Sequence, residues 1–248
     1  MTDLLTLLES FNRKERFILM TQASAGAVPL GVSAQFRERL NAVLPETVQV
    51  PDLDRVTYVL AMDFHLNWLA AALQLAYRGK SVNEDLAQSS NESAGQISGA
   101  PKGKAFERNQ EDIDLLLGWV AGERTKLVLV EAKAHTSWQT GQVASKSARF
   151  AAIFGTNGQT YADAPVDVAF VLAGFKTPKQ PQFMKAWDQF ALRETGTHSK
   201  TRRFIPLDIP SEVLVVGEHD GQGNSQTNGG HWRVSRKQFT APGPKTPG

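Results

Sequence analysis

The 248-residue chain contains no cysteine, which excludes disulfide bonds, thiolate metal sites and cysteine nucleophiles. It has no run of 18 apolar residues that could form a membrane-spanning helix. Its first residues also lack the basic start and the small-residue cleavage site of a signal peptide. We therefore expect a cytoplasmic protein with no membrane partner.

The chain also has little net charge, a formal +2, so it is not a strongly basic protein that coats nucleic acid. A locally basic surface would still be enough for binding nucleic acid. The hydrophobic fraction of 41% and the charged fraction of 21% are those of an ordinary folded protein. The length allows one large domain or two small ones, and no strong internal boundary is visible.

The most informative segment contains two acidic strands in succession. Residues 127–131 form a short apolar run rich in β-branched side chains, which predicts a strand. Residues 113–117 predict a second strand with one acid among apolar residues, and the turn residues 121–124 between them indicate a hairpin. Such a hairpin would place Asp114 beside Glu131.

The second strand leads into an acid-x-Lys triplet. Because side chains alternate along a strand, Glu131 and Lys133 are expected to project to the same side. An acid in one strand, followed by an acid, any residue and Lys at the end of the next, resembles the PD-(D/E)xK nuclease superfamily. The resemblance covers roughly residues 60 to 175, with Ile113 where the signature has proline before Asp114. It implies a restriction-endonuclease-like α/β fold, in which helices flank a mixed central sheet.

The remaining pattern predicts three regions. Apolar periodicity in residues 3–20, and a helix starting at Ser33, predict an N-terminal helical cap over residues 1–55. A nuclease-like α/β core with a C-terminal hairpin is predicted for residues 56–239, and a disordered tail for residues 240–248.

Within the core, a buried helix is predicted from Asp63, which either caps it or serves as an extra acid, to a stop at Gly79. Residues 81–104 are predicted to form a loop, and residues 166–174 a buried strand parallel to the catalytic one. Near the C-terminus, residues 218–230 are interpreted as a long hairpin turn.

The resemblance implies a divalent metal, Mg²⁺ or Mn²⁺, with metal ligands at Asp114, Glu131 and Ala132. It implies that Lys133 orients or deprotonates an attacking water and stabilises the transition state. Members of the family often have a Gln or Lys on the following helix that points at the site. Gln142 and Lys146 match those positions, although a solvated polar helix face explains them equally well.

The resemblance further implies hydrolysis of nucleic acid, with DNA as the expected substrate, by an endonuclease or an exonuclease, and it leaves a homodimer open. The basic residues expected to contact nucleic acid are Lys146, Arg149, Lys200, Arg202 and Arg203. Two alternatives remain open at this point. One is a catalytically inactive protein of the same fold that binds nucleic acid or a protein partner. The other is an α/β interaction module with an incidental ion pair between Glu131 and Lys133.

Overall fold

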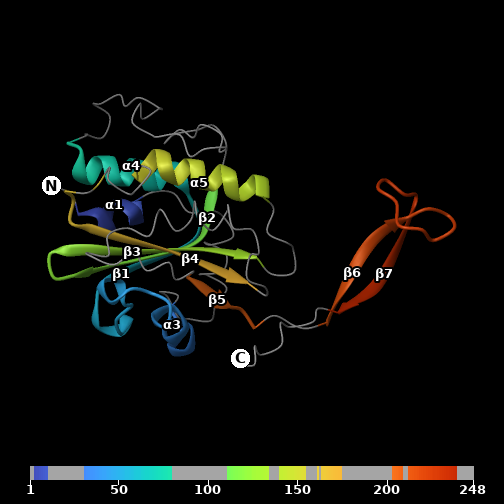
Figure 1. Ribbon diagram of the computed structural model, residues 1–248, viewed down its shortest axis with the longest axis horizontal. Coiled ribbons are helices and arrows are strands. Elements are labelled where there is room, and N and C mark those ends of the chain that lie inside the picture. The colour runs from blue at the N-terminus through green and yellow to red at the C-terminus, as the bar shows by residue number, and fades with distance from the viewer. Residues whose placement is uncertain are drawn as a thin grey trace, which may run out of the picture.

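The computed structural model contains a five-stranded sheet with helices on both faces and a separate two-stranded sheet (Figure 1). The predicted α/β class, with a mixed sheet flanked by helices, is confirmed at this level. The structure describes residues 3–10, 31–79, 111–133, 140–154, 161, 163–174, 203–208 and 212–238. Predictions that fall on residues 81–104, on the tail 240–248, and on Lys200 and Arg202 lie outside these ranges.

The five-stranded sheet is antiparallel on one side and parallel on the other. In spatial order its strands are β1 (Tyr58–His65), β2 (Asp112–Ala121), β3 (Arg124–Lys133), β4 (Val166–Gly174) and β5 (Phe204–Pro206). The first three pair antiparallel, whereas β4 is parallel to both β3 and β5. The predicted hairpin is confirmed: Ala121 pairs with Arg124, and Gly122 takes the positive φ of 61° that the tight turn requires.

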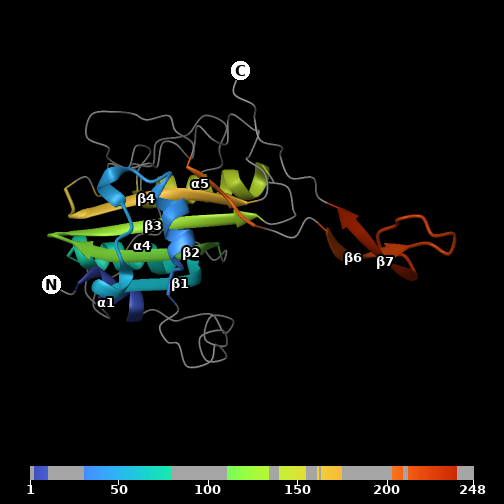
Figure 2. The same ribbon diagram turned by 90° about the horizontal axis from the view of Figure 1, so that it is seen from below.

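Helices cover both faces of this sheet (Figures 1 and 2). The helices on one face are α1 (Leu4–Ser10), α4 (Leu66–Tyr77) and α5 (Thr140–Phe154). The other face carries α3 (Ala34–Asn41) and the short 3₁₀ helices η1 (Glu46–Val48) and η2 (Leu53–Arg55). The described helices of residues 1–55 therefore lie in two different layers. None of the helices in the described ranges is long and apolar enough to cross a membrane.

The alternation of side chains along β3 produces the two cores. Leu127 and Leu129 point into the core beneath α4 and α5, whereas Val128 and Val130 point into the core beneath α3, and all four are buried. Burying such a side chain contributes about 1.5–3 kcal/mol each. Because both faces of β3 are anchored in this way, the position of its last residues is firmly set.

Two helix boundaries depend on caps. Ser33 begins α3 as predicted, with its hydroxyl accepting a hydrogen bond from the Phe36 N–H at 3.2 Å. The predicted start of α4 at Asp63 was wrong, because β1 continues to His65, whose Nδ1 accepts from the Asn67 N–H at 3.2 Å. Pairing of Phe64 with Ile113 keeps this part of the chain in the sheet, a long-range constraint that local helix signals do not contain.

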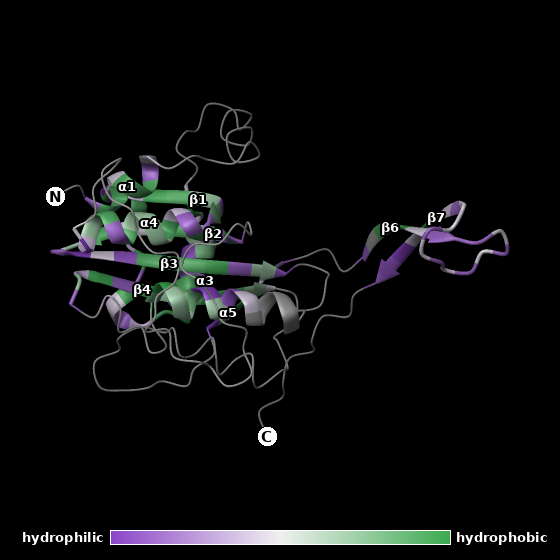
Figure 3. Cartoon of the chain, turned by 90° about the horizontal axis from the view of Figure 1, so that it is seen from above, coloured by the Kyte–Doolittle hydropathy of each residue, from purple (hydrophilic) through white to green (hydrophobic). Residues whose placement is uncertain are grey.

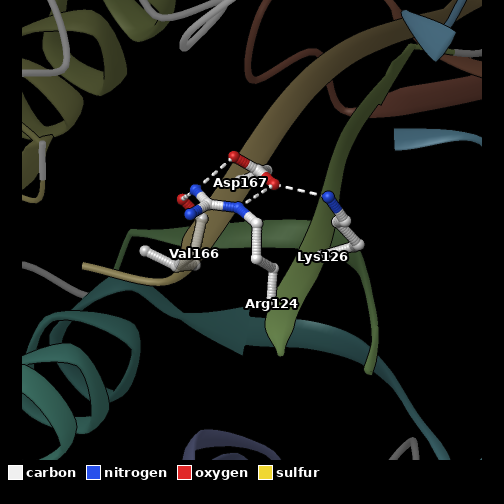
Figure 4. A network of polar contacts seen from close by, with 4 residues as sticks. All are labelled: Arg124, Lys126, Val166 and Asp167. Atoms are coloured by element: carbon white, nitrogen blue, oxygen red, sulfur yellow. Dashed lines mark hydrogen bonds and ion pairs between the residues drawn. The ribbon is translucent and has the colours of Figure 1, made fainter. Parts of the chain in front are cut away.

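Strands β3 and β4 are tied together where both begin (Figure 4). The guanidinium of Arg124 donates to both carboxylate oxygens of Asp167, at 2.8 and 2.7 Å, and to the Val166 carbonyl at 3.3 Å. The Lys126 ammonium donates to the same carboxylate at 2.5 Å. This network lies at the end of β3 opposite to Glu131 and fixes the parallel register there.

The second sheet is a hairpin of β6 (Glu212–His219) and β7 (His231–Gln238). It extends away from the five-stranded sheet in both ribbon views (Figures 1 and 2). The turn predicted for residues 218–230 is present between the two strands, and the predicted C-terminal hairpin is confirmed. The C-terminal hairpin is therefore separate from the central sheet.

Candidate active site

Asp114 and Glu131 meet at one end of the central sheet, where β2 begins and β3 ends. Leu115 pairs with Val130, the last pair of the two strands, and Asp114 and Glu131 are the next residues of β2 and β3 beyond it. The Ala132 N–H donates a 2.6 Å hydrogen bond to Asp114 Oδ2. The predicted position of Asp114 beside Glu131 is confirmed, because this bond attaches the Asp114 carboxylate to the backbone of the acid-x-Lys triplet.

Glu131 lies between two ammonium groups. Lys133, on the same side of β3, has its Nζ 3.6 Å from Glu131 Oε1. Lys146 reaches over from α5 and donates to Glu131 Oε2. Glu131 itself is only 3% exposed, so this carboxylate is enclosed by the protein and its two cationic neighbours.

The ionised form of Glu131 is disfavoured here. Burial raises the pKa of Glu131 above its ordinary value, the Lys146 ammonium opposes that effect, and the negative charge of Asp114 adds to it. Lys133 also acts to lower this pKa, yet the two ammoniums do not cancel burial and repulsion together. The site therefore holds two carboxylates close enough to repel each other, a condition that a divalent cation between them would relieve.

Lys146 belongs to this carboxylate cluster. We predicted that it would contact nucleic acid or point toward the site, and the structure shows the second arrangement: its side chain is 14% exposed and bound to Glu131. The packing of α5 over this end of the sheet brings the ammonium to β3. Gln142 lies on the same helix, but its side chain is outside the part of the structure that is described.

Arg149 is buried as well, which does not fit the contact with nucleic acid that we predicted for it. It lies three residues after Lys146 on the same face of α5, is 1% exposed, and donates through Nη2 to Asn67 Oδ1 at 2.6 Å. Arg203 is also buried. Neither guanidinium lies on the surface, so neither can contact a phosphate backbone in this conformation.

Glu111 and Ser145 form part of the site that the sequence did not reveal. The Ser145 hydroxyl donates to Glu111 Oε1, and the Glu111 carbonyl accepts from the Leu66 N–H at 2.9 Å. The residue thus connects the start of β2 with α4 and α5. Glu111 Oε2 is buried with no hydrogen-bond partner among the described residues. An acid three positions before Asp114 was visible in the sequence, but its neighbour on α5 was not.

Asp63 lies on the neighbouring strand at the same level as Asp114. The pairs Met62 with Leu115 and Phe64 with Ile113 bracket these two aspartates. Asp63 has a positive φ of 50°, which is uncommon for a residue other than glycine and costs about 1–3 kcal/mol. We predicted that Asp63 is either an extra acid of the site or the cap of α4. The second role is excluded because His65 caps α4, and the first stays a prediction.

The donor atoms at the site fit a magnesium-type cation. No group of three or more His, Cys, Asp or Glu side chains suited to a metal occurs within the described ranges. Mg²⁺, however, is usually bound by one or two carboxylates and retains several waters. Asp114 and Glu131, with the Ala132 carbonyl, provide such an oxygen set. The negative charge of Asp114, which helps to raise the pKa of Glu131, supports this fit, and Lys146 or Lys133 would have to release a Glu131 oxygen to the cation.

Comparison of the chain with protein-family models, with curated proteins and with solved structures gave no match. The function must therefore be inferred from the side chains at this end of the sheet.

Proposed function

We propose that this protein is a metal-dependent nuclease with a restriction-endonuclease-like core, which hydrolyses phosphodiester bonds of DNA by direct attack of water. The observation that carries the proposal is the meeting of Asp114, Glu131 and Lys133 at one end of the sheet, with Asp114 bound to the Ala132 N–H at 2.6 Å. Two strands supply all three groups, so their mutual positions are set by the sheet.

Asp114, Glu131 and the Ala132 carbonyl would hold Mg²⁺ or Mn²⁺, which when bound neutralises charge on a phosphate and makes a water nucleophilic near neutral pH. Without a cation, the two carboxylates are balanced by the ammoniums of Lys133 and Lys146. Addition of a divalent cation therefore leaves the site with excess positive charge. A phosphodiester anion, whose charge grows in the transition state, is the kind of substrate that such a site favours.

The two lysines have different places in this arrangement. Lys133 is 22% exposed and Lys146 is 14% exposed, so Lys133 is the more accessible to substrate and water. We assign to Lys133 the orientation or deprotonation of the attacking water and the stabilisation of transition-state charge. Lys146 is a positioning residue whose ammonium, on α5, donates a hydrogen bond to Glu131 Oε2.

The test is cleavage of a mixed panel of DNA and RNA substrates with Mg²⁺, Mn²⁺ or Ca²⁺. We expect cleavage with Mg²⁺ and Mn²⁺ but none with Ca²⁺, which should bind without supporting turnover. The double variant Asp114→Asn, Glu131→Gln should lose activity while its circular dichroism spectrum remains native. Cleavage by that variant at the wild-type rate would overturn the proposal.

A catalytically inactive binding protein with the same core is the second candidate. It is favoured by one observation, that both oxygens of Glu131 already face ammonium groups. Such a protein would show no heat of Mg²⁺ binding in calorimetry and no difference between wild type and the double variant. The proposed nuclease binds Mg²⁺ measurably, and the double variant does not.

A further inference from the structure

The C-terminal hairpin has two faces of different character. Residues directly opposite each other in an antiparallel pair project to the same face. By the observed register, one face, which we call the basic face, carries no carboxylate. Its described members are Gly217, His219, His231, Arg233, Ser235 and Lys237. The opposite, apolar face includes Leu214, Val216, Trp232 and Val234, all exposed, and the ion pair of Arg236 with Glu212.

Arg233, on the basic face, differs from the cations of the central sheet. Arg124 and Lys126 pair with Asp167, and Lys133 and Lys146 pair with Glu131. By contrast, no carboxylate lies within ion-pair distance of Arg233 among the described residues. Its Nη2 instead lies 2.5 Å from the position that a Cβ on Gly223 would occupy, so the turn leaves room for the guanidinium. An exposed cation without an acidic neighbour is suited to an anionic partner.

The turn that supports this face is well ordered by hydrogen bonds. Asp220 Oδ1 accepts from the backbone N–H of Gln222 at 2.9 Å and of Asn224 at 2.8 Å. The Asn224 side chain donates to Asp220 Oδ2 at 2.9 Å, and these bonds hold the pKa of Asp220 below its ordinary value. Glu218 accepts from the Asn228 N–H at 2.6 Å. These bonds fix the far end of the hairpin, so its basic face is preorganised for binding.

The dimensions of the basic face match a duplex backbone. Arg233 and Lys237 are four residues apart on β7, which places their Cα atoms about 14 Å apart at a strand rise of about 3.4 Å per residue. That distance is the axial rise of about four nucleotides of B-DNA. A two-stranded ribbon also fits the major groove. Figure 3 shows that the hairpin stands clear of the core, as a segment that enters a groove must.

Of the five basic residues predicted to contact nucleic acid, the three that the structure describes cannot supply this contact. Lys146 is bound to Glu131, and Arg149 and Arg203 are buried. We propose that the basic face of the β6–β7 hairpin binds the phosphate backbone of duplex DNA, through Arg233 and Lys237, and so delivers the duplex to this protein. The inference rests on the proposed function for its choice of DNA as the ligand.

The test measures binding of a short fluorescein-labelled DNA duplex to the full chain by anisotropy, in EDTA so that no cleavage occurs. Arg233→Gln is compared with Arg236→Gln, a matched change on the same strand whose arginine lies on the opposite face and is already paired with Glu212. Each lost phosphate contact lowers the salt slope of log K by about one and the affinity by about fivefold to tenfold near 0.1 M salt. We expect that loss for Arg233→Gln, a larger one for Arg233→Gln with Lys237→Gln, and wild-type affinity for Arg236→Gln. Arg233→Lys, which keeps the charge, should retain most of the affinity.

Equal affinities of Arg233→Gln and Arg236→Gln would overturn the inference. A second pair of results would also overturn it. Arg233→Gln would bind DNA like wild type, and Trp232→Ser would lose a dimer that wild type forms in analytical ultracentrifugation. The hairpin would then be a protein-binding element. The two proposals fail separately. If Arg233→Gln binds like wild type while wild type cleaves DNA, the inference about the hairpin fails alone. If Arg233→Gln weakens binding but no metal supports cleavage, the nuclease proposal fails alone.

Discussion

The two ends of β3 carry similar groups with opposite electrostatic outcomes. At its start, burial acts to raise the pKa of Asp167, but hydrogen bonds from Arg124 and Lys126 outweigh it and leave the pKa below its ordinary value. At its end, burial of Glu131 outweighs Lys146 and Lys133, and the pKa is raised. Each end has one buried carboxylate and two cations.

The difference has two causes. Asp167 receives three well-directed hydrogen bonds from its cations, two of them bidentate from Arg124 (Figure 4). Glu131 receives one such bond, from Lys146, while Lys133 remains 3.6 Å away and Asp114 adds a like charge. The hydrogen bonds at the start of β3 therefore stabilise the ionised carboxylate, whereas the surroundings at its end disfavour ionisation of Glu131.

The largest effect that separates the two ends concerns catalysis. Lys133→Ala should keep the carboxylates in place but lower the cleavage rate by about 10²- to 10⁴-fold, because the ammonium acts mainly in the transition state. Lys133→Arg should also be poor, since a planar guanidinium that stays charged does not replace a compact ammonium. The matched control is Lys126→Ala at the other end, which should lose stability but cleave at the wild-type rate. Single-turnover cleavage assays measure the rates of the Lys133 and Lys126 variants. Equal rates for Lys133→Ala and wild type would remove Lys133 from the mechanism.

Metal binding gives the next largest difference. At a Mn²⁺ concentration 100 times the dissociation constant, binding to the native state alone adds about 2.7 kcal/mol of stability. For a chain of this length that is a rise in melting temperature of about 5–10 °C. Asp114→Asn with Glu131→Gln should abolish the rise, whereas Asp167→Asn should keep it. Differential scanning fluorimetry with and without Mn²⁺ measures this, and a rise that persists in the double variant would show that the metal binds elsewhere.

Removal of one acid at each end should affect folding in different ways. Asp167→Asn leaves Arg124 and Lys126 without their carboxylate and should cost about 2 kcal/mol, below the usual loss for a fully buried pair because Arg124 is partly exposed. Asp114→Asn relieves repulsion against Glu131, so it should be neutral or stabilising. Urea denaturation of both variants tests the contrast. The predicted contrast between the two ends of β3 is contradicted if Asp114→Asn proves as destabilising as Asp167→Asn.

The smallest effect is a pair of opposite pH dependences. The pKa of Asp167 is lowered, so its contribution to stability is present above its ordinary value of 3.8 and is lost as the pH falls through the folded value. The pKa of Glu131 is raised, so its contribution is present below its ordinary value of 4.5 and is lost as the pH rises through the folded value. Glu131→Gln should therefore gain stability relative to wild type as the pH rises above 4.5. Asp167→Asn should lose stability relative to wild type as the pH rises. Urea titrations across this range measure both slopes, and slopes of the same sign would contradict the comparison.

The sequence by itself determined the central hairpin and its acids. The short apolar, β-branched run in residues 127–131, with a glycine-containing turn before it, predicts β3 and its pairing with β2, and that pairing places Asp114 against the acid-x-Lys triplet. The side-chain period of a strand is two, so Glu131 and Lys133 necessarily share a side. These are local rules, and for that reason the residue pattern alone identifies the candidate carboxylates and Lys133.

Only the tertiary structure decided which partners these residues have. Lys146 and Arg149 are basic residues on one helical face, a pattern that is the same whether the face meets solvent, a phosphate or a buried carboxylate. The packing of α5 against the sheet directs the first to Glu131 and the second to Asn67. The extension of β1 to His65 likewise depends on β2, which lies more than 40 residues away along the chain. Local sequence reports the conformation and the chemistry of a residue, but its neighbours across the core are set by how distant elements pack.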